Sequence, residues 1–151
     1  RDYGSWLFLS EILIDKKISP DQVFNEDLCG TCTACIDDCP TDAIIEPYVL
    51  DSNKCISYLT IEYRGDFPDN KKNDLDNWIY GCDICQEVCP WNIKFETQTE
   101  NSHFLPREDI KKRKSIKDWD ISKEEFSQIF KKSAVKRTKY EGLKRNIDLV
   151  K

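Results

Sequence analysis

The sequence predicts a small α+β protein in which a cysteine-rich body with short strands is followed by a small helical tail. The first observation behind this prediction is that all eight cysteines lie between positions 29 and 89, where apolar runs are short and broken by turn residues. The second is that the chain becomes Lys-rich after Pro106 and takes up helical apolar spacing. Hydrophobic residues make up only 39% of the 151 residues, so we expect little regular structure and a modest core.

The individual elements follow from local apolar patterns and from capping signals. Ser122 and Glu125 have the spacing of a capping box, and an apolar stripe follows them at Phe126, Ile129 and Phe130. The other expected elements are a buried strand over residues 6–14, a short strand over 48–50, helices over 55–63 and 74–80, and a second tail helix over 139–150.

Charge is unevenly distributed along the chain, whose net charge is −5. Residues 1–100 carry 8 Lys or Arg and 20 Asp or Glu, whereas residues 101–151 carry 15 and 8. A basic tail on an acidic body is typical of contact with a polyanion such as nucleic acid, and equally of a solvated helical surface. No apolar run approaches the roughly 20 residues that a membrane-crossing helix needs, so we expect no membrane contact.

The cysteines form one complete motif and one partial repeat of it. The complete motif has the spacing C-x2-C-x2-C-x3-C-P, the bacterial ferredoxin signature for 4Fe–4S clusters, and consists of Cys29, Cys32, Cys35, Cys39 and Pro40. The partial repeat lacks the first position and consists of Cys82, Cys85, Cys89 and Pro90. Cys55 is the remaining candidate for that position, with 26 residues between it and Cys82.

Two-cluster ferredoxins exchange the fourth cysteine of each motif between the clusters. We therefore expect cluster 1 to take Cys29, Cys32, Cys35 and Cys89, and cluster 2 to take Cys39, Cys55, Cys82 and Cys85. An uncrossed arrangement, in which Cys39 and Cys89 change places, stays open. Two structural zinc sites are a further alternative, although zinc gives no reason for the repeated spacing or the repeated proline.

Interleaved ligands imply two clusters that are close neighbours and pass single electrons. All eight cysteines are used as ligands, so none is left as a nucleophile. The residues alone therefore predict an electron conduit whose acceptor they do not specify. We expect an external one-electron donor as its partner. We expect nearby aromatic side chains to shield the clusters, namely Trp78, Tyr80 and Trp91.

The residues between the cysteines carry a more specific signal than the cysteines themselves. The informative blocks are Cys39-Pro40-Thr41-x-Ala43-Ile44 with Glu46-Pro47-Tyr48, then Asp51-x3-Cys55-Ile56-Ser57-Tyr58-Leu59-Thr60-Ile61-Glu62, and finally Ile79-Tyr80-Gly81-Cys82-Asp83-x-Cys85-Gln86-x-Val88-Cys89-Pro90-Trp91-Asn92. With the cysteine motif, these blocks resemble the epoxyqueuosine reductases, a family of cobalamin-dependent enzymes of tRNA queuosine biosynthesis. The similarity covers most of residues 4–95.

The resemblance implies an oxidoreductase that reduces epoxyqueuosine in tRNA to queuosine, with two 4Fe–4S clusters passing electrons to cobalamin. It also implies that the cobalamin lies against Ser57, Cys82, Asp83 and Ser5. Apart from the family, Ser57 suits a solvent-facing helical serine and Asp83 suits a helix cap. The candidates for contact with the tRNA backbone are Arg137, Lys144 and Arg145, for which a solvated helix face is the alternative.

Family members carry a cobalamin-binding domain and a proton-donating carboxylate upstream of the region that resembles this chain. Because the sequence opens with Arg1 and contains no Met, we expect it to be part of a longer protein. Residues 1–18 would end the cobalamin-binding domain, residues 19–96 would form the ferredoxin-like module, and residues 97–151 the basic helical tail. We therefore expect no catalytic residue in this chain, no turnover by it alone, a monomeric state and a cytoplasmic location.

Two other functions stay open. A stand-alone dicluster electron carrier for another reductase needs only the cysteines, and a zinc-binding RNA-interaction module would combine the thiols with the basic tail. Iron and acid-labile sulfide content separates the zinc module from the other two functions.

Overall fold

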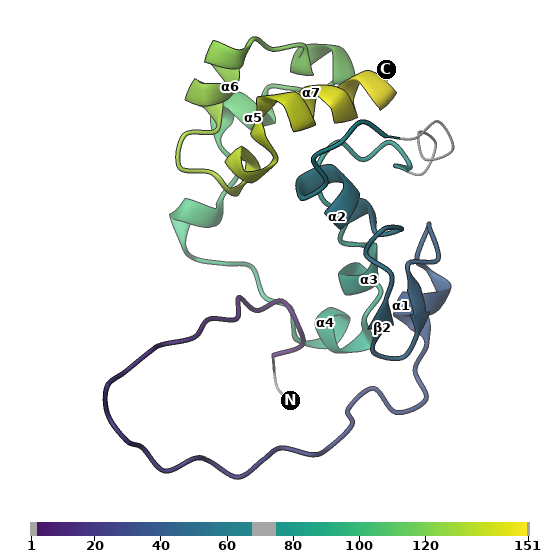
Figure 1. Ribbon diagram of the computed structural model, residues 1–151, viewed down its shortest axis with the longest axis vertical. Helices are drawn as coiled ribbons and strands as arrows, with labels where there is room; N and C mark the ends of the chain where they lie inside the picture. Colours follow the sequence, from purple (N-terminus) through teal and green to yellow (C-terminus); the bar gives the residue numbers. More distant parts are fainter. Residues whose placement is uncertain (1–2, 68–74, 151) are drawn as a thin grey trace.

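The computed structural model describes residues 3–67 and 75–150, which form three successive parts. A long extended segment, residues 6–27, sweeps away from the rest and returns to it (Figure 1). A body of short helices then carries the cysteines, and a helical tail lies against one end of that body.

The body is built from short elements and one two-stranded antiparallel sheet. In that sheet Ile44 pairs with Leu50, and Glu46 pairs with Val49. The expected short strand near residues 48–50 and the expected helix within 55–63 are confirmed. The elements are α1 (Ala34–Asp37), β1 (Ile44–Glu46), β2 (Val49–Leu50), α2 (Ile56–Ile61), α3 (Ile84–Glu87) and α4 (Pro90–Phe95).

Among the described residues of the body, few large apolar side chains are buried. One hydrophobic cluster is formed by Leu59, Phe67 and Leu75, and Ala43 and Ile56 are buried as well. A fully buried aliphatic or aromatic side chain contributes only about 1.5–3 kcal/mol. The body therefore needs another source of cohesion.

The tail has a hydrophobic core of its own, in which no member is more than 5% exposed. Its members are Ile121, Phe126, Phe130, Leu143 and Ile147. Trp119 stacks on Phe130 at the edge of this core, with ring centroids 6.2 Å apart. The elements are η2 (Ser102–Phe104), α5 (Glu108–Lys111), η3 (Ile116–Trp119), α6 (Lys123–Ile129), η4 (Ala134–Thr138) and α7 (Lys139–Val150).

Both predicted tail helices are confirmed. Ser122 Oγ accepts a hydrogen bond from the Glu125 amide at 3.1 Å, and Glu125 Oε2 accepts one from the Ser122 amide at 2.7 Å, so a capping box begins α6. The second tail helix, α7, spans the predicted residues 139–150. An unpredicted capping box, formed by Ser115 and Asp118, begins η3.

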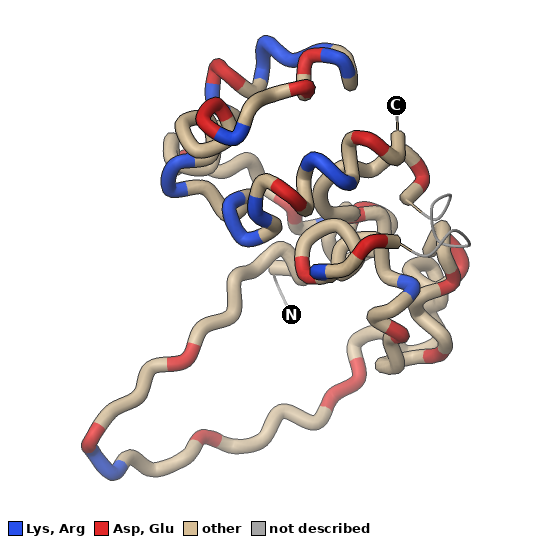
Figure 2. Tube along the Cα trace, turned by 45° about the horizontal axis from the view of Figure 1, so that its top comes forward, with Lys and Arg blue, Asp and Glu red and all other residues tan. Residues whose placement is uncertain are grey.

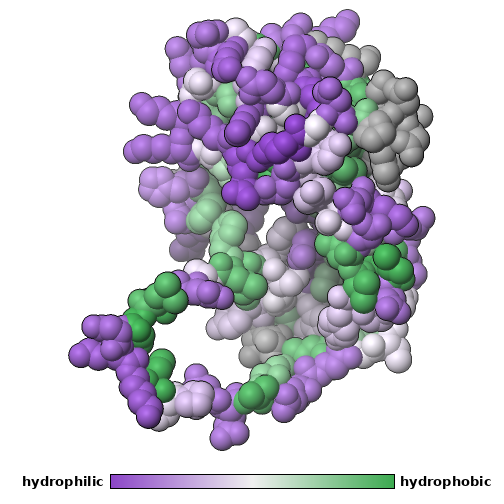
Figure 3. Space-filling model, viewed as in Figure 1, coloured by the Kyte–Doolittle hydropathy of each residue, from purple (hydrophilic) through white to green (hydrophobic). Residues whose placement is uncertain are grey.

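The expected buried strand over residues 6–14 is wrong. This stretch is extended, but it belongs to no sheet among the described residues, and Leu9 and Leu13 are 94% and 95% exposed. Figure 3 shows apolar side chains strung along the extended segment without cover. A strand needs a neighbour for its backbone hydrogen bonds, and the described residues provide none here. Phe8 stacks on Phe104, with ring centroids 5.7 Å apart.

The expected helix over residues 74–80 is also wrong for its described part, because Asp74 lies outside the described residues. Asp76 and Asn77 have φ values of 44° and 66°. Such left-handed backbone is incompatible with a right-handed helix. The chain instead turns directly after Leu75, which is 1% exposed and anchors the turn in the body.

The body and the tail carry charges of opposite sign, with acidic side chains in excess in the body and basic side chains in excess in the tail. Figure 2 shows Lys and Arg gathered on the tail, while Asp and Glu dominate the extended segment and much of the body. Within residues 3–67 and 75–150, no helix has the length and apolar character needed to cross a membrane.

Candidate metal centre

The two cysteine motifs fold into two copies of one local structure. In each copy a four-residue helix begins one residue before the third cysteine of the motif, α1 at Ala34 and α3 at Ile84. The amide of the fourth cysteine closes each turn with a bond of 3.3 Å, from Cys39 to the Ile36 carbonyl and from Cys89 to the Gln86 carbonyl. The sequence repeat is therefore also a structural repeat, and α1 packs against α3.

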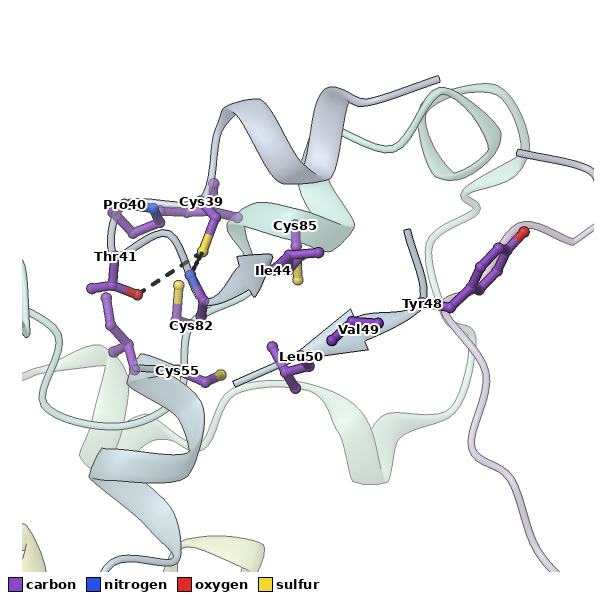
Figure 4. Close-up of a pocket in the computed structure, with 13 residues that line it drawn as sticks. Cys39, Pro40, Thr41, Ile44, Tyr48, Val49, Leu50, Cys55, Cys82 and Cys85 are labelled. Carbon is purple, nitrogen blue, oxygen red and sulfur yellow. Dashed lines mark hydrogen bonds between the residues drawn. The ribbon is translucent and has the colours of Figure 1, made fainter. Parts of the chain in front are cut away.

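Four thiols from separate parts of the chain surround a cavity of about 310 Å³; they belong to Cys39, Cys55, Cys82 and Cys85. In Figure 4 their sulfur atoms lie around a common space, whereas the ring of Tyr48 points away from it. Cys55 reaches this set because it directly precedes α2, whose first residue, Ile56, is only 2% exposed and so is fixed in the body.

A second cavity, of about 580 Å³, is lined by five cysteines, namely Cys29, Cys32, Cys35, Cys85 and Cys89. Trp91 lines this cavity too, and its Nε1 donates to the Leu28 carbonyl at 2.8 Å, which fixes the chain just before the first motif. The expected shielding role thus has a structural basis for Trp91. Trp78 and Tyr80 are half-buried and do not line either of these cavities.

The fourth cysteines of the two motifs lie in opposite cavities. Cys39 lines the cavity that contains Cys82, whereas Cys89 lines the cavity that contains Cys29. Charge interactions between thiols follow the same division except at Cys85, which lines both cavities and is also acted on by Cys35. Those acting on Cys29 come from Cys32, Cys35 and Cys89, and those acting on Cys82 come from Cys39 and Cys55.

The arrangement of the thiols fits a cluster better than a single ion. Tetrahedral zinc requires its sulfur ligands about 2.3 Å from one point. In the described part of the chain, no three His, Cys, Asp or Glu side chains converge on a point that one metal ion could occupy. Thiols set around a cavity suit a 4Fe–4S cube, whose four irons each take one of them.

Burial and hydrogen bonding shift the pKa of the cysteine thiols in opposite directions. Burial raises the pKa of Cys82 and of Cys85. At Cys39 burial has the same effect, but hydrogen bonds from the amides of Thr41 and Ala43 outweigh it and lower the pKa of the thiol. The Ala43 amide nitrogen lies 3.2 Å from Cys39 Sγ. Such bonds favour the thiolate, which is the form that binds iron.

Asp27 holds the start of the first motif. Its Oδ1 accepts hydrogen bonds from the Cys29 amide at 2.9 Å, the Gly30 amide at 3.3 Å and the Tyr48 hydroxyl at 2.7 Å. The bond to Asp27 raises the pKa of Tyr48 to about 12, and it lowers the pKa of Asp27. Gly30 takes a φ of 55°, which glycine adopts without strain. The Tyr48 turn between β1 and β2 is thereby tied to the first cysteine loop.

The residues expected near cobalamin fall in two places. Ser57 and Cys82 lie together, since Ser57 Oγ accepts from the Cys82 amide at 3.0 Å and donates to the Cys82 carbonyl at 3.1 Å. Asp83 is exposed beside them and is the N-cap residue of α3, without a side-chain capping bond. Ser5 lies at the other cavity, where its hydroxyl donates to Gln86 Oε1 at 2.6 Å.

The three basic residues expected to contact tRNA have partners within the chain. Arg137, whose side chain is 68% exposed, pairs with Glu62, and Lys144, 33% exposed, pairs with Asp148. The guanidinium of Arg145 is turned inward and lies 4.1 Å from the ring centroid of Phe67. Its hydrogen-bond acceptors include the carbonyl oxygens of Leu59, Tyr63 and Gly65. Arg145 thus fastens α7 to the end of α2.

Sequence reasoning missed the buried polar side chains that support the site. Asn92 and Asn146 are both 0% exposed. Asn92 Oδ1 accepts from the Ser5 amide, and its Nδ2 donates to the Gln86 carbonyl at 2.8 Å. The signal for Asn146 was available, because an amide between core positions such as Leu143 and Ile147 must find buried partners.

Comparisons with known proteins agree with this site. Residues 28–92 match the family described as a 4Fe-4S double cluster binding domain. The whole chain is 53% identical to the epoxyqueuosine reductase of Leadbetterella byssophila and covers 48% of it. The chain therefore spans about half the length of the curated relatives that it matches.

Solved structures of the same enzyme share the fold. The epoxyqueuosine reductase from Bacillus subtilis matches 88% of this chain at 34% identity with a TM-score of 0.74, and 35% of that protein is covered. An epoxyqueuosine reductase crystallised with an epoxyqueuosine-modified tRNA-Tyr stem loop matches 87% at 36% identity with a TM-score of 0.75, with 34% of that protein covered. Residues 28–92 thus carry a 4Fe–4S double cluster binding domain, and the chain is similar over its whole length to about half of an epoxyqueuosine reductase.

Proposed function

We propose that this chain is the electron-transfer part of an epoxyqueuosine reductase and passes single electrons through two neighbouring 4Fe–4S clusters. The observation that carries the proposal is the division of eight thiols between two cavities that share Cys85 as a common wall. When bound, the clusters supply one-electron transfer. The residues of the chain hold the clusters close together and cover them with apolar side chains.

The ligand sets that we propose are the crossed ones. Cluster 1 takes Cys29, Cys32, Cys35 and Cys89, and cluster 2 takes Cys39, Cys55, Cys82 and Cys85. The position of each fourth cysteine in the opposite cavity supports this pairing, as do the charge interactions between thiols. An external one-electron donor would reload the pair after each step.

Cobalamin is the proposed acceptor, bound against Ser57, Cys82 and Asp83. When bound, it would supply the reducing centre at which the epoxide oxygen is removed. Ser57 fixes the main chain of Cys82 through two hydrogen bonds, so this face of cluster 2 is held rigidly, and Asp83 stands exposed next to it. Ser5 is the proposed contact from the side of cluster 1.

The proposed overall reaction takes up two electrons and two protons for each epoxide, and it releases the alkene and one water molecule. The two electrons arrive singly from the external donor. We propose that the substrate is tRNA, since a solved relative is crystallised with an epoxyqueuosine-modified tRNA stem loop. Of the three tail candidates, Arg137 has the most accessible side chain for a phosphate contact and Lys144 is partly accessible, whereas Arg145 is the least suited because its guanidinium is turned inward.

The test uses the protein that contains this chain together with the segment matching the rest of its relatives, loaded with iron–sulfur clusters and cobalamin. We expect conversion of epoxyqueuosine in tRNA when a strong one-electron reductant is present. Cys55→Ala should abolish conversion, because a cluster lacking one thiolate is not retained. Binding of tRNA should stay within about twofold of the wild-type value. Asn53→Ala, two residues away and exposed, is the matched control and should stay active.

Each result separates the proposed function from its rival. No conversion by the loaded wild-type protein would favour a stand-alone electron carrier for another reductase. Full activity of Cys55→Ala would show that Cys55 is not a ligand and would overturn the proposed cluster 2.

A further inference from the structure

A chain of hydrogen bonds runs from the tail helix α7 into the body. It begins at Asn146, whose side chain is 0% exposed. Asn146 Nδ2 donates to the carbonyl oxygens of Thr60 and Ile79, each at 2.9 Å. One amide group of the tail therefore joins two separate segments of the body, α2 and the stretch that leads to Cys82.

The two segments that Asn146 joins are those that set the position of Cys82. Thr60 Oγ1 accepts a hydrogen bond from the Gly81 amide at 3.0 Å, and Ser57 Oγ accepts one from the Cys82 amide at 3.0 Å. Residues 79–82 are thus held at three successive places. The first contact comes from α7, and the other two come from α2.

The same helix α2 carries a second cysteine of that set. Cys55 is the N-cap residue of α2, so a shift of α2 relative to residues 79–82 would change the separation of Cys55 and Cys82. The crossed and the uncrossed pairings both put these two cysteines on one cluster. The geometry of that cluster therefore depends on how firmly α2 and residues 79–82 are joined.

The amide of Asn146 is itself firmly held. Its Oδ1 accepts from Arg145 Nη2 at 2.9 Å, and Thr138 Oγ1, from a residue 1% exposed, donates to the same Thr60 carbonyl at 2.8 Å. A buried polar group that loses its partner carries the full cost of desolvation. Removing the Asn146 amide would leave the Ile79 carbonyl without that donor, and the stretch before Cys82 would loosen.

We propose that Asn146 is a positioning residue for the cluster that Cys82 ligates, and that the tail thereby forms part of the redox centre. Asn146 acts through the Ile79 carbonyl and α2, not by direct contact with a ligand thiol. The inference rests on the proposed ligand role of Cys82.

The test compares two substitutions at adjacent buried positions of α7 in the full chain with both clusters assembled. Asn146→Ala removes the amide that bridges the two segments, whereas Ile147→Ala removes an apolar side chain, 1% exposed, from the tail core. The measurements are the rate of iron release to a chelator and the electron paramagnetic resonance signal of each reduced cluster. Cys55→Ala, which should lack the cluster of Cys82, identifies which signal belongs to it.

We expect Asn146→Ala to release the Cys82 cluster about tenfold faster and to alter its resonance signal, an effect of the size of one lost hydrogen bond. The other cluster should be unaffected. Ile147→Ala should lower the thermal stability of the tail at least as much, without selective release. If Asn146→Ala does not fold, Asn146→Gln, which keeps the amide but shifts it by one methylene, serves the same comparison.

Equal effects of the two substitutions on both clusters would overturn the inference, because the tail would then act only through general stability. No change in either cluster in Asn146→Ala would overturn it as well. Retention of all iron by Cys82→Ala is a different result, which would remove the proposed ligand set on which the inference rests.

Discussion

The cysteine-rich body and the helical tail are each stabilised by a different kind of interaction. The tail gathers Ile121, Phe126, Phe130, Leu143 and Ile147 into one buried cluster, whereas the body has a smaller cluster of Leu59, Phe67 and Leu75. The body instead places eight thiols around two cavities. The difference indicates that iron and sulfide complete the core of the body, while the tail folds on its own side chains.

Removal of the metal should produce the largest difference between the two parts. After iron is stripped with a chelator under anaerobic conditions, we expect amide hydrogen exchange in α1, α3 and α4 to approach that of unfolded chain. Exchange in α6 and α7 should stay slow, because the apolar cluster of the tail does not depend on metal. Loss of protection in both parts together would show that the tail has no independent stability.

Substitution of Phe130 should destabilise the tail and leave the clusters of the body largely unchanged. Phe130 is 2% exposed at the centre of the tail core, and Phe130→Ala should cost about 3–5 kcal/mol of tail stability. Thermal unfolding followed by circular dichroism measures this loss, and the visible absorption of the clusters should change much less. Phe104→Ala, at a residue 59% exposed, is the control and should have an effect below about 0.5 kcal/mol.

Arg145 tests the joint between the two parts. We expect Arg145→Ala to cost about 1.5–3 kcal/mol, since hydrogen bonds from a charged donor to the carbonyls at the end of α2 are lost. The control is Lys144→Ala, one residue away. Lys144 forms ion pairs with Asp120 and Asp148 at the surface, and its loss should cost about 0–1 kcal/mol of stability. Unchanged stability of Arg145→Ala with weaker tRNA binding would instead favour a direct role in binding tRNA.

The smallest expected effect is a loss of tail stability in acid. The hydrogen bond from Lys123, which like Glu141 belongs to the tail, lowers the pKa of Glu141 from its usual value of 4.5. A carboxyl group whose pKa is lower in the folded state contributes stability above its unfolded pKa and loses it as the pH falls through the folded value. Thermal unfolding of the tail in the metal-free chain should therefore move to lower temperature below pH 4.5, and Glu141→Gln should reduce that dependence.

Local patterns predicted the parts of the structure that local interactions determine. The cysteine spacing predicted the loops of the two cysteine motifs. Ser122 and Glu125 predicted the start of α6, because a capping box involves only four successive residues. The absence of a strand over residues 6–14 could not be predicted in the same way, because an apolar stretch forms a strand only where a partner strand is available. The bridge from Asn146 to the Ile79 carbonyl joins residues distant in sequence, and the turn at Asp76 and Asn77 follows Leu75, which is buried against Leu59 and Phe67.

The most direct test of the central claim, that the body is completed by two clusters with interleaved ligands, is electron paramagnetic resonance of single cysteine variants in the reduced chain. Cys39→Ala and Cys55→Ala should lose the signal of the same cluster, whereas Cys89→Ala should lose the signal that Cys29→Ala loses. If Cys39→Ala and Cys29→Ala instead remove one and the same signal, the ligands are not interleaved and the account of the metal centre is wrong.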